Sequence, residues 1–210
     1  GVHMYYGNAA IVADPSTNTI WDANYLAVYH HSGNVLDASP AGNNGTNNGT
    51  TASTGSQIGD GRDFDGTNDY VQTAISVQTE DEFTFSAWID ADVLGKAHIV
   101  WEGHSSQNGW GSSGGANEQE AHLALGTCCG LAGVESDNVV DAFLGNDEDE
   151  TDAQVLNTNS AYTVINTWHH VAAVYSDMSG TPQVDLYLDG AFVGTDNGVV
   201  GASTSRANWN

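Results

Sequence analysis

Closely spaced carboxylates are the residues of this sequence best suited to chemistry, because hard cations such as calcium prefer several oxygen ligands held in one loop. Asp63, Asp65 and Asp69 lie close together, and Gly66 between them permits a sharp turn. Strand alternation would place Asp63 and Asp65 on the same face. We expect either a calcium loop or a turn in which Asp and Asn side chains cap backbone amides, and the spacing leaves both open.

A second group of carboxylates lies in residues 146–152, where Asp147, Asp149 and Asp152 alternate with other polar residues. Carboxylates packed this closely repel one another unless a cation neutralises them. These three residues are therefore further calcium candidates. A solvated acidic loop is the alternative interpretation.

Cys128 and Cys129 are adjacent, an unusual arrangement for a disulfide. Neighbouring α-carbons lie about 3.8 Å apart, which is shorter than ordinary disulfides prefer. Gly126 and Gly130 would ease the turn of a strained vicinal disulfide, and two free thiols are the alternative. Zinc is not expected, because there is no second Cys pair and no His at ligand spacing.

Alternating apolar and polar residues predict the elements that position these groups. Val184, Leu186 and Leu188 would point to one face of a strand while Asp185 and Tyr187 point to the other. A two-residue turn at 189–190, with Asp followed by Gly, suits a hairpin. Strands are expected near residues 4–6, 26–30, 62–65, 69–73, 83–90, 97–101, 121–125, 139–144, 168–175, 183–188 and 191–195, with a low-complexity loop within residues 42–60.

Two long polar insertions separate the expected strands, at residues 103–120 and 145–160. Polar loops between strands commonly carry binding residues. Trp110 lies among Gly, Ser and Asn, and an exposed aromatic ring there could stack on a sugar. We therefore expect Trp110, with His104 and Asn108, to contact a ligand.

Four phrases in order resemble the laminin-G-like jelly rolls of the concanavalin A-like lectin/glucanase superfamily. They are residues 64–71, 83–88, 168–172 and 186–190. The resemblance covers roughly residues 25 to 200 and implies an all-β fold. This fold is a two-sheet antiparallel jelly-roll sandwich with an N-terminal strand extension.

The resemblance also suggests a domain organisation. Residues 1–24 look like the tail of an uncharacterised domain often found ahead of such jelly rolls in bacterial and archaeal surface proteins. Residues 25–210 would then be the jelly-roll domain. Family members usually finish with a strand that reads like I-D-E-V-R-I. The given sequence reaches residues 208–210 without a strand of this kind.

The charge and the distribution of apolar residues each argue against one class of partner. The formal net charge is −24, from 27 acidic residues against 3 basic ones. A nucleic-acid binder needs a basic footprint, so nucleic acid is not an expected partner. No run of roughly 18 apolar residues is available for membrane insertion. Depletion of Lys and Arg suits a saline or calcium-rich exterior, or simply a soluble, self-repelling surface.

Catalysis is not expected. Glycoside hydrolases of the resembled superfamily carry carboxylates in an E-x-D-x-x-E pattern on one strand. The nearest approach, residues 118–122, lacks the middle Asp.

The resemblance and the composition together predict a non-catalytic module, extracellular or at a cell surface, that recognises a glycan or a cell-surface protein and is associated with calcium. One alternative is a structural subunit of a surface filament or layer, which self-associates by strand exchange. Another is an accessory carbohydrate-binding domain of a polysaccharide-degrading enzyme. Fold alone does not decide among them.

Overall fold

The computed structural model describes residues 20–77, 79–92, 98–103, 121–126, 140–144, 154–157 and 165–197. Regular structure in these residues is entirely β-strand, and nothing in them forms a helix able to cross a membrane. Contacts divide the chain into two compact units, residues 1–75 and residues 76–210, and each unit is considered by itself.

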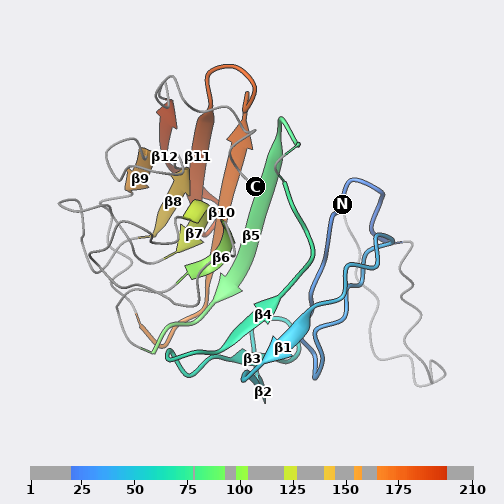
Figure 1. Cartoon of the computed structure of the whole chain (residues 1–210). Helices are drawn as coiled ribbons and strands as arrows, with labels where there is room; N and C mark the ends of the chain where they lie inside the picture. The colour runs from blue at the N-terminus through green and yellow to red at the C-terminus, as the bar shows by residue number, and fades with distance from the viewer. Residues whose placement is uncertain are drawn as a thin grey trace, which may run out of the picture. The chain divides into compact units, whose positions relative to one another are not determined.

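The second unit contains two four-stranded antiparallel sheets (Figure 1). Sheet 1 has the order β12-β11-β10-β5, and sheet 2 has the order β6-β7-β8-β9. Strand β8 lies against β11 and β9 against β12, so the sheets face each other as a sandwich. This arrangement confirms the predicted all-β antiparallel sandwich. Sheet 1 comprises β5 (Phe83–Ile89), β10 (His169–Ser176), β11 (Gln183–Leu188) and β12 (Ala191–Asn197), and sheet 2 comprises β6 (His98–Gly103), β7 (Ala121–Gly126), β8 (Asp141–Leu144) and β9 (Gln154–Asn157).

The inner face of sheet 1 forms the core of the second unit. Alternate residues of β10 are fully buried, and Val184 and Leu186 are buried in the neighbouring strand β11. Phe83 of β5 stacks on Tyr175, with ring centroids 4.7 Å apart. The intervening residues of β11, Asp185 and Tyr187, are not buried, so the predicted alternation in this strand is confirmed. The buried residues of β10 are Val171, Ala173 and Tyr175.

A two-residue turn joins β11 to β12, as the sequence predicts. Asp189 and Gly190 have φ angles of 51° and 77°, in the left-handed region that such hairpin turns require. The Asp189 carboxylate also accepts a hydrogen bond from the backbone N–H of His170, at 2.9 Å. The turn is therefore fastened to the start of β10.

The first unit contains two short antiparallel pairs. Strand β1 (Thr46–Asn48) pairs with β4 (Tyr70–Gln72), and β2 (Thr51–Ser53) pairs with β3 (Gly61–Asp63). The prediction of a continuous loop over residues 42–60 was wrong, because β1 and β2 lie within it. Their connection is a compact turn in which Asn47 and Thr50 exchange hydrogen bonds and Gly49 takes a φ of 88°.

Two other sequence expectations differ from the structure. Strand β9 lies inside the segment 145–160, which was expected to be an insertion without strands. Its apolar pair, Val155 and Leu156, gives a short strand that completes sheet 2 beside β8. Residues 26–30 were expected to form a strand, but only an isolated bridge between Tyr29 and Asp37 is present there.

Asp37 organises the segment around this bridge. Its carboxylate accepts hydrogen bonds from the backbone N–H groups of Val28, Ser39 and Asn43 and from the Ser39 hydroxyl, each at 2.8 Å. Burial opposes ionisation of this carboxyl group, but the four hydrogen bonds outweigh it and lower the Asp37 pKa. Residues 26–45 are therefore held together largely by one charged side chain.

Candidate functional site

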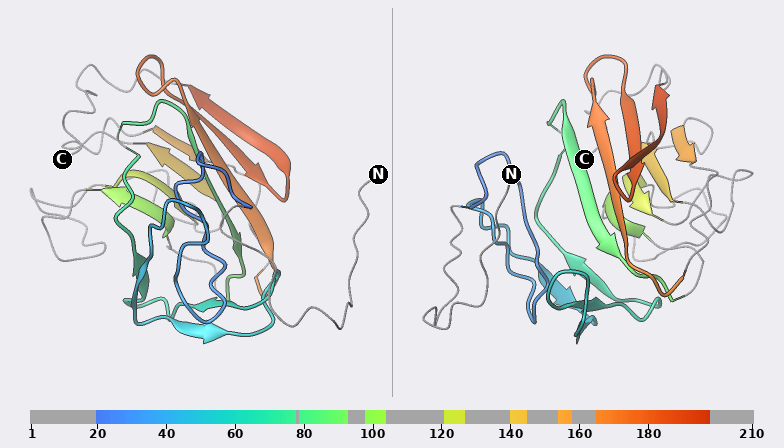
Figure 2. Two further views of the ribbon diagram at one scale, coloured as in Figure 1. Left: turned by 90° about the vertical axis from the view of Figure 1, so that its right-hand side faces the viewer. Right: turned by 180° about the vertical axis from the view of Figure 1, so that it is seen from behind.

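The outer face of sheet 1 carries exposed aromatic side chains. Strand alternation directs Trp88 of β5 away from the core, on the same face as Thr84 and Ser86. Trp88 is 40% exposed and Phe192 in β12 is 56% exposed, so both residues are available to a ligand. The right-hand view of Figure 2, which is turned by 180° from Figure 1, shows the strands of this sheet, from β5 in green to β12 in red.

The aromatic residues form two cross-strand pairs. Trp88 lies directly opposite His170 of β10, with ring centroids 5.3 Å apart and an edge-to-face geometry. Tyr187 lies opposite Phe192, with centroids 5.6 Å apart and a similar geometry. Ala172 lies between the two pairs. It is opposite Tyr187 in the neighbouring strand β11 and follows His170 by two residues in β10. The short side chain of Ala172 therefore separates two rigid aromatic pairs on one face.

Hydrogen-bonding groups border these aromatic pairs. Asp185 precedes Tyr187 by two residues on the same face of β11, and Thr195 lies opposite Asp185. The Gln183 side-chain amide donates a hydrogen bond to Asp185 Oδ1 at 3.0 Å, which holds the carboxylate in place. The outer face thus combines apolar ring surfaces with oriented hydrogen-bond acceptors, the combination that small-molecule sites use for affinity and orientation.

His169 and Asp189 hold the end of β10 from which His170 projects. His169 Nδ1 and Asp189 Oδ2 lie 2.7 Å apart. The hydrogen bond from His169 lowers the Asp189 pKa, and the bond from the His170 N–H acts in the same direction, while partial burial opposes both. As expected for adjacent residues in a strand, His169 and His170 belong to opposite faces, so only His170 joins the aromatic face.

Two of the three aspartates predicted as calcium ligands in the first unit, Asp65 and Asp69, form a hydrogen-bonded turn, whereas Asp63 is the last residue of strand β3. Asp65 Oδ1 accepts hydrogen bonds from the backbone N–H groups of Thr67 and Asn68, at 2.8 and 3.4 Å. Asp69 Oδ2 accepts one from the Asp65 N–H at 3.0 Å. This is the capped-turn arrangement that the sequence left open beside the calcium loop.

No group of three or more His, Cys, Asp or Glu side chains is placed to hold a metal ion among the residues that the structure describes. Asp63, Asp65 and Asp69 all lie in that described part of the chain. The other predicted sites lie outside the described residues and stay predictions, as does bound calcium. They are Trp110, His104 and Asn108, the acidic residues Asp147, Asp149 and Asp152, and the adjacent Cys128 and Cys129.

The aromatic residues of the outer face were not predicted from the sequence. Trp88 lies at the end of the phrase at residues 83–88, which indicates the fold but not a site. Its position, two residues from Ser86 and four from Thr84, was a usable signal, because those polar residues mark the solvent side of the strand. Tyr187 carried the same signal through its spacing from Asp185.

Comparison with known families gives the class of this protein. Residues 65–210 match the family Laminin_G_3, described as the Concanavalin A-like lectin/glucanases superfamily, and the chain belongs to this family. The jelly-roll prediction is thereby confirmed. Comparison with curated proteins and with solved structures gave no match.

Membership of this family supports a carbohydrate- or protein-binding module. Domains of this kind are typically non-catalytic and commonly extracellular. The match begins at residue 65, whereas the compact units divide after Ile75 and the sequence suggested a boundary after Asn24. The assignment of residues 1–24 to a preceding domain stays a prediction.

Proposed function

We propose that this chain is a non-catalytic extracellular module that binds a glycan on the outer face of sheet 1. The observation that carries the proposal is the presence of two exposed aromatic residues on one face of sheet 1. Trp88 lies on β5 and Phe192 on β12, the first and last strands in the order of this sheet. The rings are braced by His170 and Tyr187. Aromatic side chains held in this way offer contact area at a small entropic cost.

The chemistry of the face suits a sugar better than an entirely apolar ligand. A sugar ring has an apolar face that can lie on Trp88 or Phe192, and hydroxyl groups around its edge. Asp185, fixed by Gln183, and Thr195 can accept or donate hydrogen bonds to such hydroxyls. Membership of a lectin-containing superfamily supports the same class of ligand.

The charge of the chain narrows the ligand further. A net charge of −24 repels sulfated or uronic-acid glycans at long range, so neutral or amino sugars are the proposed ligands. We also propose calcium as a stabilising ion. Its ligands would include aspartates that the sequence predicts as calcium ligands. A cell-surface location would supply both the glycan and the calcium.

A glycan array with purified variants tests the proposal. Trp88→Ala and Phe192→Ala should each weaken binding of the best neutral glycan at least about tenfold, which corresponds to about 1.4 kcal/mol. Phe64→Ala is the matched control, because Phe64 is a 48% exposed aromatic residue of the first unit. Equal binding by all four proteins would refute the proposed site. Repeating the array with calcium and with a chelator separates an effect of calcium from the contribution of the rings.

A further inference from the structure

Strand β5 lies at the edge of sheet 1. In the described part of the chain it pairs only with β10, and no strand is hydrogen-bonded to its other side. An edge strand of this kind presents unpaired N–H and C=O groups that can template another strand.

The hydrogen-bonding pattern identifies which residues present these groups. The Asp189 N–H donates to the His170 carbonyl at 2.7 Å, so His170 directs its backbone groups toward β11. In an antiparallel ladder the neighbouring residues, such as Val171 and Ala173, then face β5. Their partners in β5 are Ala87 and Phe85, which face back toward β10. The backbone groups of the intervening residues therefore point to the open edge, and these residues are Thr84, Ser86 and Trp88.

The burial of the inner face also indicates an incomplete edge. Tyr175 and Ala173 of β10 are fully buried, whereas their partners in β5, Phe83 and Phe85, are only partly buried. The core is therefore closed at β10 and remains partly accessible at β5. An added strand with apolar residues at alternate positions would cover these side chains as well as pair with the backbone.

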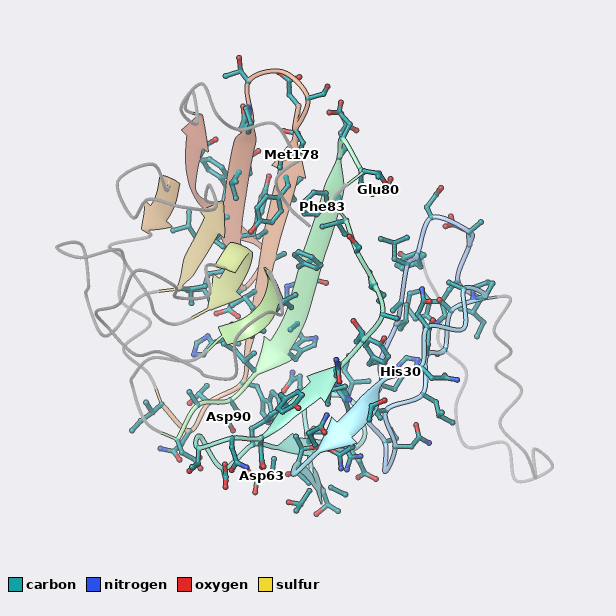
Figure 3. All side chains as sticks on the ribbon, in the orientation of Figure 1. His30, Asp63, Glu80, Phe83, Asp90 and Met178 are labelled. Carbon is teal, nitrogen blue, oxygen red and sulfur yellow. The ribbon has the colours of Figure 1, made fainter. Side chains whose placement is uncertain are left out.

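The charges around β5 favour one kind of partner. The strand itself has no charged residue, but exposed carboxylates flank it at both ends. Figure 3 places Glu80 near one end, beside Phe83, and Asp90 at the other end. A second copy paired antiparallel through β5 would bring like charges together at both ends, which is unfavourable. The flanking residues are Glu80, Asp81 and Glu82 before the strand, and Asp90 and Asp92 after it.

We propose that β5 is a strand-addition site for an extended segment of another protein, with apolar residues at alternate positions and Lys or Arg at both ends. Backbone hydrogen bonds to Thr84, Ser86 and Trp88 would supply affinity. The inward apolar residues and the basic ends would supply selectivity. This site uses the outward backbone groups of β5, including those of Trp88, whereas the proposed glycan binding uses the side chains of Trp88 and Phe192.

A synthetic peptide of alternating valine and threonine, with two lysines at each end, is the probe. Fluorescence anisotropy should show that the native protein and Ser86→Ala bind the peptide alike. Ser86→Pro should bind at least about tenfold more weakly, because proline removes an outward N–H. Proline is tolerated on an edge strand where its nitrogen faces away from the ladder, so pairing with β10 should persist. Equal binding by Ser86→Ala and Ser86→Pro would overturn the proposal.

A modified peptide tests the proposal without altering the fold. N-methylation of alternate backbone amides, on the side that pairs, should abolish binding to the native protein. Glutamates in place of the terminal lysines should also abolish it, whereas retained binding of both peptides would contradict strand addition to this edge.

Two further experiments would reveal another occupant of the β5 edge. A dimer of the native protein in sedimentation velocity that Ser86→Pro dissociates would identify a second copy. Peptide binding only by a variant lacking residues 198–210 would show that the chain's own segment occupies the edge. Either result would overturn the proposed partner.

Discussion

The two units of this chain are stabilised in different ways. In the described residues, every buried apolar side chain except Val35 lies in the second unit. The buried polar residues, Ser39 and Thr50, lie in the first. The second unit follows the usual logic of a sandwich, in which alternate residues of two sheets form a shared core.

The first unit depends instead on side chains that bond to the backbone. Asp37 joins Val28, Ser39 and Asn43, and the Asn43 amide in turn donates to the Leu26 carbonyl at 2.8 Å. Asp65 and Asp69 organise a second turn in the same unit. Polar side chains thus replace a large core in ordering this segment. An acidic, Asn-rich sequence can therefore specify local structure without burying much apolar surface.

The largest expected effect is from truncation of the sandwich core. Leu186→Ala removes a fully buried side chain and should lower the free energy of unfolding of the second unit by about 2–5 kcal/mol. Urea unfolding followed by the amide signals of β10 and β11 measures it. The control is Phe192→Ala, which truncates an exposed residue of the same sheet. A loss no larger than that of the control would mean that the core does not stabilise this unit.

A smaller effect, confined to the first unit, is expected from removal of its organising carboxylate. Asp37→Ala leaves three backbone N–H groups and one hydroxyl without their acceptor. The local free energy of opening should fall by about 1.5–3 kcal/mol, the range for hydrogen bonds to a charged group.

Hydrogen exchange at the amides of Val28, Ser39 and Asn43 measures this opening. Asp60→Ala is the matched control, since Asp60 is an exposed aspartate of the same unit. Exchange in β10 should not change. Unaltered protection of the three amides in Asp37→Ala would contradict the role given to this carboxylate.

The sequence predicted the second unit better than the first. Period-two alternation identified β5, β10 and β11 because each has one apolar face, and Asp189-Gly190 identified the hairpin by its chemistry. The strands β1 and β2 were missed because each is only three residues long and consists mainly of Thr, Asn and Ser, which give no apolar face.

The candidate site was harder to predict than the fold. Trp88 and His170 are distant in sequence, and their contact depends on the pairing register of β5 with β10. Alternation assigns a face to each residue but does not say which strands are neighbours. The predicted turn at Asp65 was recognisable because its hydrogen bonds are local. Long-range pairing therefore sets the limit of what the sequence alone could show.

The smallest expected effect is a difference between the two units in how they respond to a fall in pH. The pKa values of Asp37 and Asp189 both lie below the ordinary value of 3.8. Stabilisation by each carboxylate should therefore be present above that value and be lost as the pH falls through the lower, folded-state pKa. The loss should be about 0.2–1 kcal/mol for Asp189, because its partner His169 pairs with it near the surface. In the first unit, protonation of Asp37 should loosen residues 26–45 as a group.

An NMR titration from pH 6 to pH 2 tests this difference. The amide signals of Ser39 and Asn43 report on Asp37, and that of His170 reports on Asp189. All three should shift with midpoints below 3.8, and Asp189→Asn should remove the transition at His170 alone. Midpoints at or above 3.8 would show that these hydrogen bonds do not favour the ionised carboxylates. A shift at His170 that spread through β10 would show that the sandwich, too, depends on a surface carboxylate, and the contrast between the units would fail.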